Sequence, residues 1–314
     1  GNIDLLSAVT RADRWRTNTT SRPQILKKIN AHTVCADVNC VGGRMRYCRS
    51  VVSQAQPNLV INMIDFELKR AILAHATKCH PQESCGFVLS VCGDLYYYPC
   101  ANIADDPVNF FEISPEELIK AEEQGEIVAL VHSHPDSDDV RGLPYLSASD
   151  RSCQVRLDLD FWLVVGGDVK QFRNIPPLLG RQFENNKQDC RNIVLDSYML
   201  AGIDLGDESE YPFDWFKTAN LYEDGLLRCG FYRVMQESDV QIGDVVLIQV
   251  GSKVANHAGV YLGNQMMLHH SQDRLSARVP YDGFWLNNTH SIWRHKQWYK
   301  LNFTAILNDL CVSR

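Results

Sequence analysis

An apolar segment that runs directly into two histidines is the feature that most constrains this chain. Residues 126–131 have the apolar composition of a buried strand, and His132-Ser-His134-Pro follows at once. Side chains alternate between the two faces of an extended segment, so His132 and His134 point the same way and one divalent cation can contact both. The sequence therefore predicts a metal site where a strand ends.

Zinc in a hydrolase usually takes three protein ligands and leaves a fourth position for water. Asp150 is the predicted third ligand, because Ser147-Ala-Ser-Asp150 has the pattern of a helix N-cap with the aspartate one turn inside. A further carboxylate must carry the proton to the leaving amine, and Glu83, just before the strand-like residues 87–91, is the candidate. The alternatives are a capping box alone for Ser147 and Asp150, and a solvated edge position for Glu83.

This arrangement of residues resembles the JAMM (MPN+) metallopeptidase family over roughly residues 63–175. The resemblance implies zinc ligands at His132, His134 and Asp150, a general acid and base at Glu83, and an oxyanion-stabilising group at Ser147. One departure from the family pattern is visible. Twelve residues separate His134 from Ser147, more than the usual interval, which makes the serine the least constrained of these assignments.

Cap signals place other elements around this site. Ser114-Pro-Glu-Glu117 predicts a capped helix with proline at its first position, and Gly125 marks its end. Residues 64–72 carry apolar side chains at helical spacing, and residues 159–165 predict a further apolar strand.

A second chemical centre is predicted where a helix begins at Asp189-Cys190. The following residues have apolar side chains at helical spacing, and Gly202 is a typical glycine cap. In the first turn, free backbone N–H groups and the positive end of the helix dipole favour thiolate over thiol. We therefore expect Cys190 to be a nucleophile with a lowered pKa. The alternative for Cys190 is a small buried hydrophobic residue. Asp196, further along the same helix, is expected to be a solvated helix residue.

Two histidines on a predicted hairpin complete this centre. Residues 257–269 predict two strands joined by a turn at Gly263-Asn264. His257 is the candidate base and His269 the residue that orients it. His270 is the alternative orienting residue, although it should point to the opposite face of its strand.

These residues resemble the NlpC-type papain-like cysteine peptidases over roughly residues 179–300. The resemblance implies Cys190 as nucleophile, His257 as general base and His269 as the group that holds the tautomer of the base. It also implies peptidoglycan stem peptides as substrate, with cleavage at a bond adjoining γ-D-glutamate and a diamino acid.

The two patterns in this order resemble the tail assembly proteins of lambda-like phages over about residues 63–310. The expected fold class is α+β: a JAMM/MPN-like α/β domain at 63–175 and a papain-like NlpC-type α+β domain at 176–314, after an N-terminal extension at 1–62. The resemblance implies a tail-tip assembly protein with two hydrolase domains and other phage tail-tip proteins as partners. It would lie in the host bacterial cytoplasm during assembly, or at the virion tail tip. The alternative is a structural assembly factor whose peptidase-like domains serve as binding surfaces.

The segment 1–62 is rich in Arg, Asn, Thr and Ser, which predicts a partly ordered extension or a small module. It contains Cys35, Cys40 and Cys48, and with a fourth thiolate from elsewhere these would suit an iron–sulfur cluster. An arm that docks on a partner protein is the alternative.

Length, charge and cysteine content limit the classes of protein to which this chain can belong. A chain of 314 residues suits two domains and a tail. The net charge of -7 argues against a general nucleic-acid surface. No signal-peptide pattern is visible, and no apolar run approaches the ~20 residues that cross a bilayer. Eleven scattered cysteines, one of them wanted as a reduced nucleophile, favour a reducing compartment.

Overall fold

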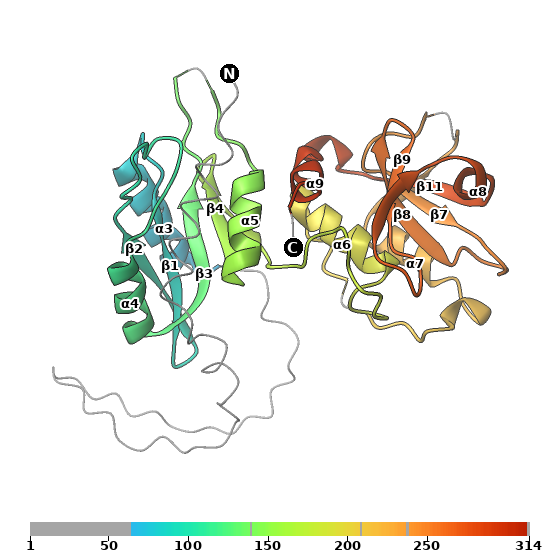
Figure 1. The fold of residues 1–314 in the computed structure, drawn as a ribbon, viewed down its shortest axis with the longest axis horizontal. Coiled ribbons are helices and arrows are strands. Elements are labelled where there is room, and N and C mark those ends of the chain that lie inside the picture. Colours follow the sequence, from blue (N-terminus) through green and yellow to red (C-terminus); the bar gives the residue numbers. More distant parts are fainter. Residues whose placement is uncertain (1–63, 139, 208, 237–238, 313–314) are drawn as a thin grey trace, which may run out of the picture. The chain divides into compact units, whose positions relative to one another are not determined.

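The structure, a computed structural model, describes residues 64–138, 140–207, 209–236 and 239–312. These residues form two mixed α and β domains, as expected for the α+β class (Figure 1). The predicted extension at 1–62, with the proposed iron–sulfur ligands Cys35, Cys40 and Cys48, lies outside the described residues, so both stay predictions. Among the described helices, none combines the length and apolar character needed to cross a bilayer.

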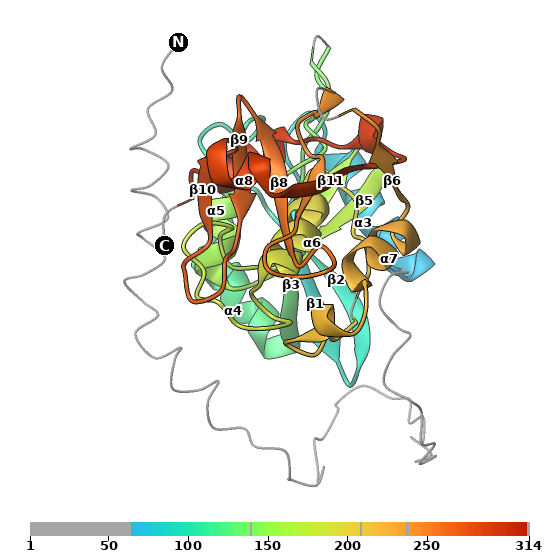
Figure 2. The ribbon, with the colours of Figure 1, turned by 90° about the vertical axis from the view of Figure 1, so that its right-hand side faces the viewer.

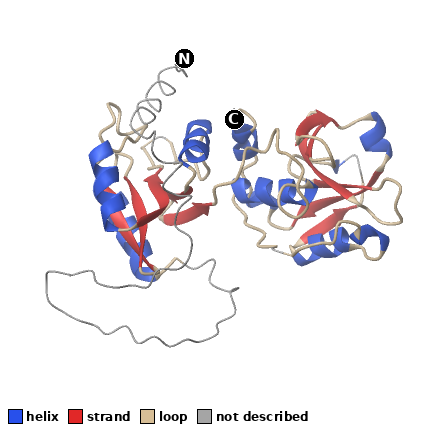
Figure 3. Cartoon of the chain, turned by 60° about the horizontal axis from the view of Figure 1, so that its bottom comes forward, coloured by secondary structure: helices blue, strands red, loops and turns tan. Residues whose placement is uncertain are grey.

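The first domain is built on a five-stranded sheet with the strand order β2-β1-β3-β4-β5. β3 and β4 pair in parallel and the other neighbours pair in antiparallel fashion. Two helices, α3 and α4, lie against one face of the sheet and α5 against the other (Figures 1 and 3). The elements are α3 (Phe66–Cys79), β1 (Cys85–Val91), β2 (Asp94–Cys100), α4 (Pro115–Gln124), β3 (Glu126–Ser133), α5 (Ala148–Leu157), β4 (Asp160–Val165) and β5 (Asp168–Phe172).

β3 is the central strand, and it extends further than the sequence predicted. Its last residues pair on both sides, because His132 lies opposite Cys85 of β1 and opposite Leu163 of β4. The strand therefore includes His132 and Ser133 rather than ending at Val131. This pairing fixes the backbone of the first histidine within the sheet.

The predicted helix after Ser114 is confirmed. The Ser114 hydroxyl accepts a hydrogen bond from the Glu117 backbone N–H, Pro115 is the first residue of α4, and the helix ends before Gly125. The reciprocal half of the predicted capping box does not form. The Glu117 carboxylate instead accepts hydrogen bonds from the Tyr98 hydroxyl and the Lys120 ammonium.

The second domain is built on a six-stranded sheet with the order β10-β9-β8-β7-β11-β6, and all neighbours are antiparallel. The long helix α6 packs against β8 and β9 (Figure 2). The elements are α6 (Cys190–Ala201), η1 (Trp215–Lys217), α7 (Leu221–Arg228), β6 (Phe231–Val234), β7 (Val245–Ile248), β8 (His257–Gly263), β9 (Met266–His269), β10 (Ala277–Pro280), α8 (Gly283–Asn287), β11 (Thr289–His295), η3 (Trp298–Lys300) and α9 (Thr304–Asp309).

Both ends of α6 follow the sequence prediction. The Asp189 carboxylate accepts a hydrogen bond from the Asn192 backbone N–H, and Gly202 ends the helix in the left-handed conformation. Asp196 was expected to be a solvated helix residue, and this was wrong. Its carboxylate is buried and lies 2.6 Å from the guanidinium of Arg181, which is fully buried.

Candidate functional site

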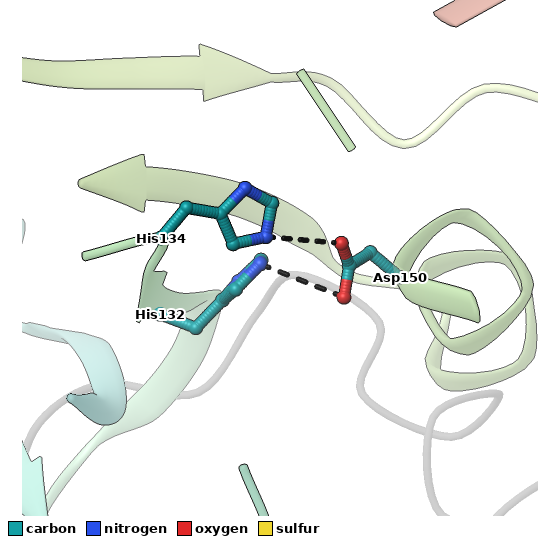
Figure 4. Close-up of side chains that lie close together, drawn as sticks. All are labelled: His132, His134 and Asp150. Atoms are coloured by element: carbon teal, nitrogen blue, oxygen red, sulfur yellow. Dashed lines mark ion pairs between the residues drawn. The ribbon is translucent and has the colours of Figure 1, made fainter. Parts of the chain in front are cut away.

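The three predicted metal ligands converge in the first domain (Figure 4). The Asp150 carboxylate lies 3.6 Å from His132 Nε2 and 3.3 Å from His134 Nε2. One ligand atom from each residue lies within 4.8 Å of the other two. Burial opposes ionisation of Asp150, but the two imidazoles hold the pKa of its carboxyl well below the usual range.

Local structure explains this convergence. His132 sits inside β3 and His134 just beyond it, where the His134 backbone N–H still donates to the Val164 carbonyl at 2.9 Å. The Ser147 hydroxyl accepts a hydrogen bond from the Asp150 backbone N–H at the start of α5, and the Asp150 carboxylate accepts one from the Ser147 backbone N–H, which completes a capping box. The alternative of a capping box is therefore compatible with the metal site, because the same carboxylate serves both.

The surroundings of His132 fit a cation. The side chain is fully buried, and neither ring nitrogen has a hydrogen-bond partner. The ring stacks on Phe111 with centroids 4.9 Å apart and contacts the edge of Phe161 at 5.7 Å. Burial lowers the pKa of His132, so the imidazole is neutral and keeps the lone pair that a metal needs. A buried imidazole nitrogen without a partner is costly unless a metal ion occupies that position, so the donor set suits zinc.

The unusually long loop before Ser147 orients the second histidine. His134 Nδ1 lies 2.8 Å from the Leu143 carbonyl, and a proton on Nδ1 leaves Nε2 free to bind a metal. The loop is closed on itself, because the Asp136 carboxylate accepts a hydrogen bond from the Gly142 N–H at 2.7 Å. Burial opposes the charged form of His134, but Asp150 and the Leu143 carbonyl outweigh it and raise the pKa.

Glu83 is buried, and close enough for the charges of Asp150 and His134 to act on it, rather than solvated at a sheet edge. Burial, and then the charge of Asp150, raise the pKa of Glu83 to about 8, while His134 acts in the opposite direction. Its backbone is held at both ends. The N–H donates to the Pro107 carbonyl at 2.7 Å, and the carbonyl accepts from the Asn102 amide at 3.0 Å.

Ser147 lies at the N-cap next to the ligands. Its hydroxyl accepts a hydrogen bond from the Asp150 N–H at 3.1 Å and lies 2.8 Å from the Ser149 hydroxyl. Accepting the hydrogen bond of the helix cap leaves the hydroxyl proton available to donate, as the predicted oxyanion role requires, and that role stays a prediction.

In the second domain, Cys190 is the first residue of α6 and is only 6% exposed. Its Sγ lies 3.0 Å from the Tyr222 hydroxyl. Burial, and then the charge of Asp189, raise the pKa of Cys190 to about 11, while Tyr222 and the backbone N–H groups of Ala258 and Cys190 partly oppose this. The expectation of a lowered pKa was wrong, because loss of solvent outweighs the helix terminus.

The two predicted histidines of this centre are in contact. His257 Nε2 lies 2.9 Å from His269 Nδ1, whereas His270 Nε2 bonds the Arg274 carbonyl at 3.0 Å. Burial lowers the pKa of His257 to about 3 and that of His269 to about 4, so both rings are neutral at pH 7. The Trp285 ring lies against them, 4.5 Å from His269 and 5.6 Å from His257 between centroids.

Several residues at these sites carry no recognisable sequence pattern. Asn102, Phe111, Tyr222 and Trp285 reach the sites from loops or short helices. In such a segment, no sequence signal distinguishes an aromatic or amide residue that contacts a site from one that does not.

Two family models match the chain in this order: prokaryotic homologs of the JAB domain at residues 66–175, and the NlpC/P60 family at residues 177–294. Tail tip assembly protein K of Escherichia phage lambda is 47% identical over 201 residues, which cover 64% of this chain and 98% of that protein. Its counterpart from Escherichia phage N15 is 37% identical over 236 residues, covering 72% of this chain and 93% of that protein.

The chain belongs to the tail tip assembly protein K family. The members from lambda and N15 are matched over nearly their whole length, so the resemblance extends well beyond single motifs. A crystal structure of an NlpC/P60 family protein from Bacillus cereus also matches, with 12% identity and a TM-score of 0.29 over 71% of this chain and 66% of that one.

Proposed function

We propose that this protein acts in phage tail tip assembly and carries two hydrolytic centres, a zinc-dependent peptidase or isopeptidase and a thiol peptidase for peptidoglycan stem peptides. The proposal for the first centre depends on the convergence of His132, His134 and Asp150, together with the burial of His132, whose ring nitrogens have no hydrogen-bond partner. The proposal for the second depends on a cysteine at a helix start in the same domain as a coupled pair of neutral histidines.

In the first centre, His132, His134 and Asp150 would hold the zinc ion. When bound, zinc supplies a Lewis acid that polarises a carbonyl group and acidifies water. Glu83 accepts a proton from water and delivers it to the leaving amine. Burial raises the pKa of this carboxyl, which favours the protonated form that delivers the proton to the amine. The Ser147 hydroxyl donates to the oxyanion while it still accepts the hydrogen bond of the helix cap.

In the second centre, His257 removes the proton of the Cys190 thiol, and the thiolate sulfur attacks the carbonyl carbon of the scissile amide. The C–N bond then breaks, and the amine leaves with the proton that His257 received. Water hydrolyses the resulting thioester and restores the thiol. His269 Nδ1 accepts a hydrogen bond from the Nε2–H group of His257, which leaves Nδ1 of His257 as the base.

Digestion of purified peptidoglycan tests the thiol centre. We expect the wild-type protein to release soluble muropeptides and Cys190→Ala to release none, with Cys92→Ala as the control because Cys92 is exposed. Mass spectrometry of the products identifies the bond that is cut. Equal release by Cys190→Ala would contradict the proposal for this centre. His134→Ala should leave this activity unchanged, which separates the two centres.

The alternative is a structural assembly factor whose peptidase-like domains bind other tail proteins. One observation favours it: Cys190 is buried under Tyr222, and burial raises its thiol pKa. Phage carrying both Cys190→Ala and His134→Ala distinguishes the two. Normal titres of infectious particles would support the structural function, and a loss of titre with intact protein levels would support hydrolysis.

A further inference from the structure

The hydroxyl of Tyr222 is in contact with the sulfur atom that the thiol peptidase would use. Tyr222 is the second residue of α7, and its oxygen lies 3.0 Å from Cys190 Sγ, a distance short for a contact with sulfur. The two residues are 32 positions apart in the sequence. This contact therefore depends on the packing of α7 rather than on the cap of α6.

The Tyr222 ring is held firmly in this position. It packs against Trp215 with centroids 4.5 Å apart and is flanked by Tyr211 at 6.3 Å. The helix that carries it is tied down on either side of the ring. The Leu221 carbonyl accepts a hydrogen bond from the Tyr211 hydroxyl at 3.5 Å, and the Glu223 carboxylate lies 3.5 Å from His290 Nδ1.

The direction of the hydrogen bond follows from the chemistry of the two groups. A thiolate can only accept a hydrogen bond, so the phenol must be the donor once Cys190 has lost its proton. Burial, and then the neighbouring Cys190, raise the pKa of Tyr222 well above its usual value. The phenol therefore keeps its proton while the thiol ionises. A hydrogen bond to a charged acceptor is stronger than one between two neutral groups, so the bond strengthens when Cys190 ionises.

We propose that Tyr222 is a catalytic residue of the thiol centre, whose hydroxyl donates a hydrogen bond to the Cys190 thiolate and stabilises it for attack. The inference rests on the proposed thiol peptidase function. It assigns to α7 a part in the chemistry, because α7 supplies the donor that compensates for the solvent lost at Cys190. The proton released by the thiol goes to His257, and Tyr222 keeps its own.

The test is the alkylation of Cys190 by iodoacetamide in the full-length protein, followed at several pH values and resolved from the other cysteines by peptide mass spectrometry. Iodoacetamide reacts with the thiolate, so the logarithm of the rate rises with pH as the thiol ionises. Tyr222→Phe keeps the ring and removes the hydroxyl. We expect this variant to shift the dependence of the labelling rate on pH by about one unit toward higher pH. At a fixed pH, labelling should slow about tenfold.

Tyr299→Phe is the matched control. It also removes a tyrosine hydroxyl from the second domain, but this side chain lies on η3 and is 73% exposed. Labelling of Cys190 in this variant should follow the wild-type line. Unchanged labelling in Tyr222→Phe would overturn the proposal, and so would faster labelling, since the tyrosine would then merely cover the thiol.

A second variant guards against a loss of folding in Tyr222→Phe. Placing 3-fluorotyrosine at position 222 alone keeps the shape of the ring and makes the hydroxyl a stronger donor. Labelling should then be faster than in the wild type at every pH, and a slower rate would contradict the proposal. Labelling needs no peptidase turnover. If labelling of Tyr222→Phe is slower but the wild type does not hydrolyse peptidoglycan, only the proposed peptidase function is contradicted. If the wild type hydrolyses peptidoglycan but labelling of Tyr222→Phe is not shifted in pH, only the role of Tyr222 is contradicted.

Discussion

Asp150 accepts a hydrogen bond from the backbone N–H of Ser147 at 2.8 Å through the same oxygen that lies 3.3 Å from His134. One carboxylate therefore closes the start of α5 and faces the metal position. Its place in the site is fixed by the helix cap even before a metal binds. Because Asp150 has both positions, substitutions at this residue can separate metal binding from helix capping.

Asp150→Asn should abolish zinc binding and spare most of the helix cap, because an amide oxygen still accepts from the Ser147 N–H but carries no charge. Asp150→Ala should lose both. We expect the metal-free Ala variant to be less stable than the metal-free Asn variant by about 1 kcal/mol in urea unfolding. Equal stability of the two apoproteins would show that the cap contributes little.

His134→Ala should remove bound zinc from the purified protein, because two ligands remain where zinc needs three from the protein. The measurement is zinc content by mass spectrometry, about one ion per chain in the wild type. His290→Ala is the control, since His290 lies on β11 of the second domain. Unaltered zinc content in His134→Ala would contradict the ligand assignment.

Gly142→Ala should weaken zinc binding although residue 142 is not a ligand. A Cβ atom at this position would lie 2.0 Å from the His134 carbonyl oxygen, so the loop or the histidine must move. The expected result is at least a tenfold loss of zinc affinity in a chelator competition assay, a magnitude typical of losing a group that orients a ligand. Arg141→Ala, at an exposed neighbour, should bind zinc normally.

Stability of the second domain should fall as the solution is acidified below pH 6.5. The folded state holds His257 and His269 neutral, with pKa values of about 3 and about 4, whereas the unfolded chain binds protons at about 6.5. Protons taken up on unfolding favour the unfolded state by about 1.4 kcal/mol per pH unit for each histidine. His257→Gln should show a shallower loss of urea stability between pH 7 and pH 5. An identical slope would argue against neutral burial of this ring.

His269→Gln should reduce peptidoglycan hydrolysis much more than His270→Gln. Only His269 contacts His257, and His270 is occupied by the Arg274 carbonyl. Loss of the orienting residue should lower kcat by at least tenfold with little change in KM, because it acts on the tautomer of the base. A larger effect of the His270 substitution would reverse the assignment.

Sequence patterns predicted those elements whose ends are marked by local chemistry. The Ser114, Ser147 and Asp189 caps and the glycine at 202 define helix ends through contacts within a few residues, and the structure confirms each of these helices. The convergence of the three candidate metal ligands was predictable for a related reason. His132 and His134 share a strand end, and Asp150 lies in the first turn of a capped helix.

Burial was the property that the sequence did not convey. The thiol pKa was expected to fall because helix termini act locally, but the solvent lost around Cys190 is set by α7, more than thirty residues away. Asp196 was misjudged for the same reason, because its partner Arg181 arrives from a preceding segment. Interactions between distant segments decide both cases.

Asp189 stabilises the start of α6 but also raises the pKa of the Cys190 thiol. Its carboxylate secures the first turn of α6, and its negative charge disfavours a second negative charge on the adjacent sulfur. A serine or threonine would cap equally well without that repulsion. The Cys190 side chain is thereby kept in its thiol form, and a thiol is oxidised more slowly than a thiolate.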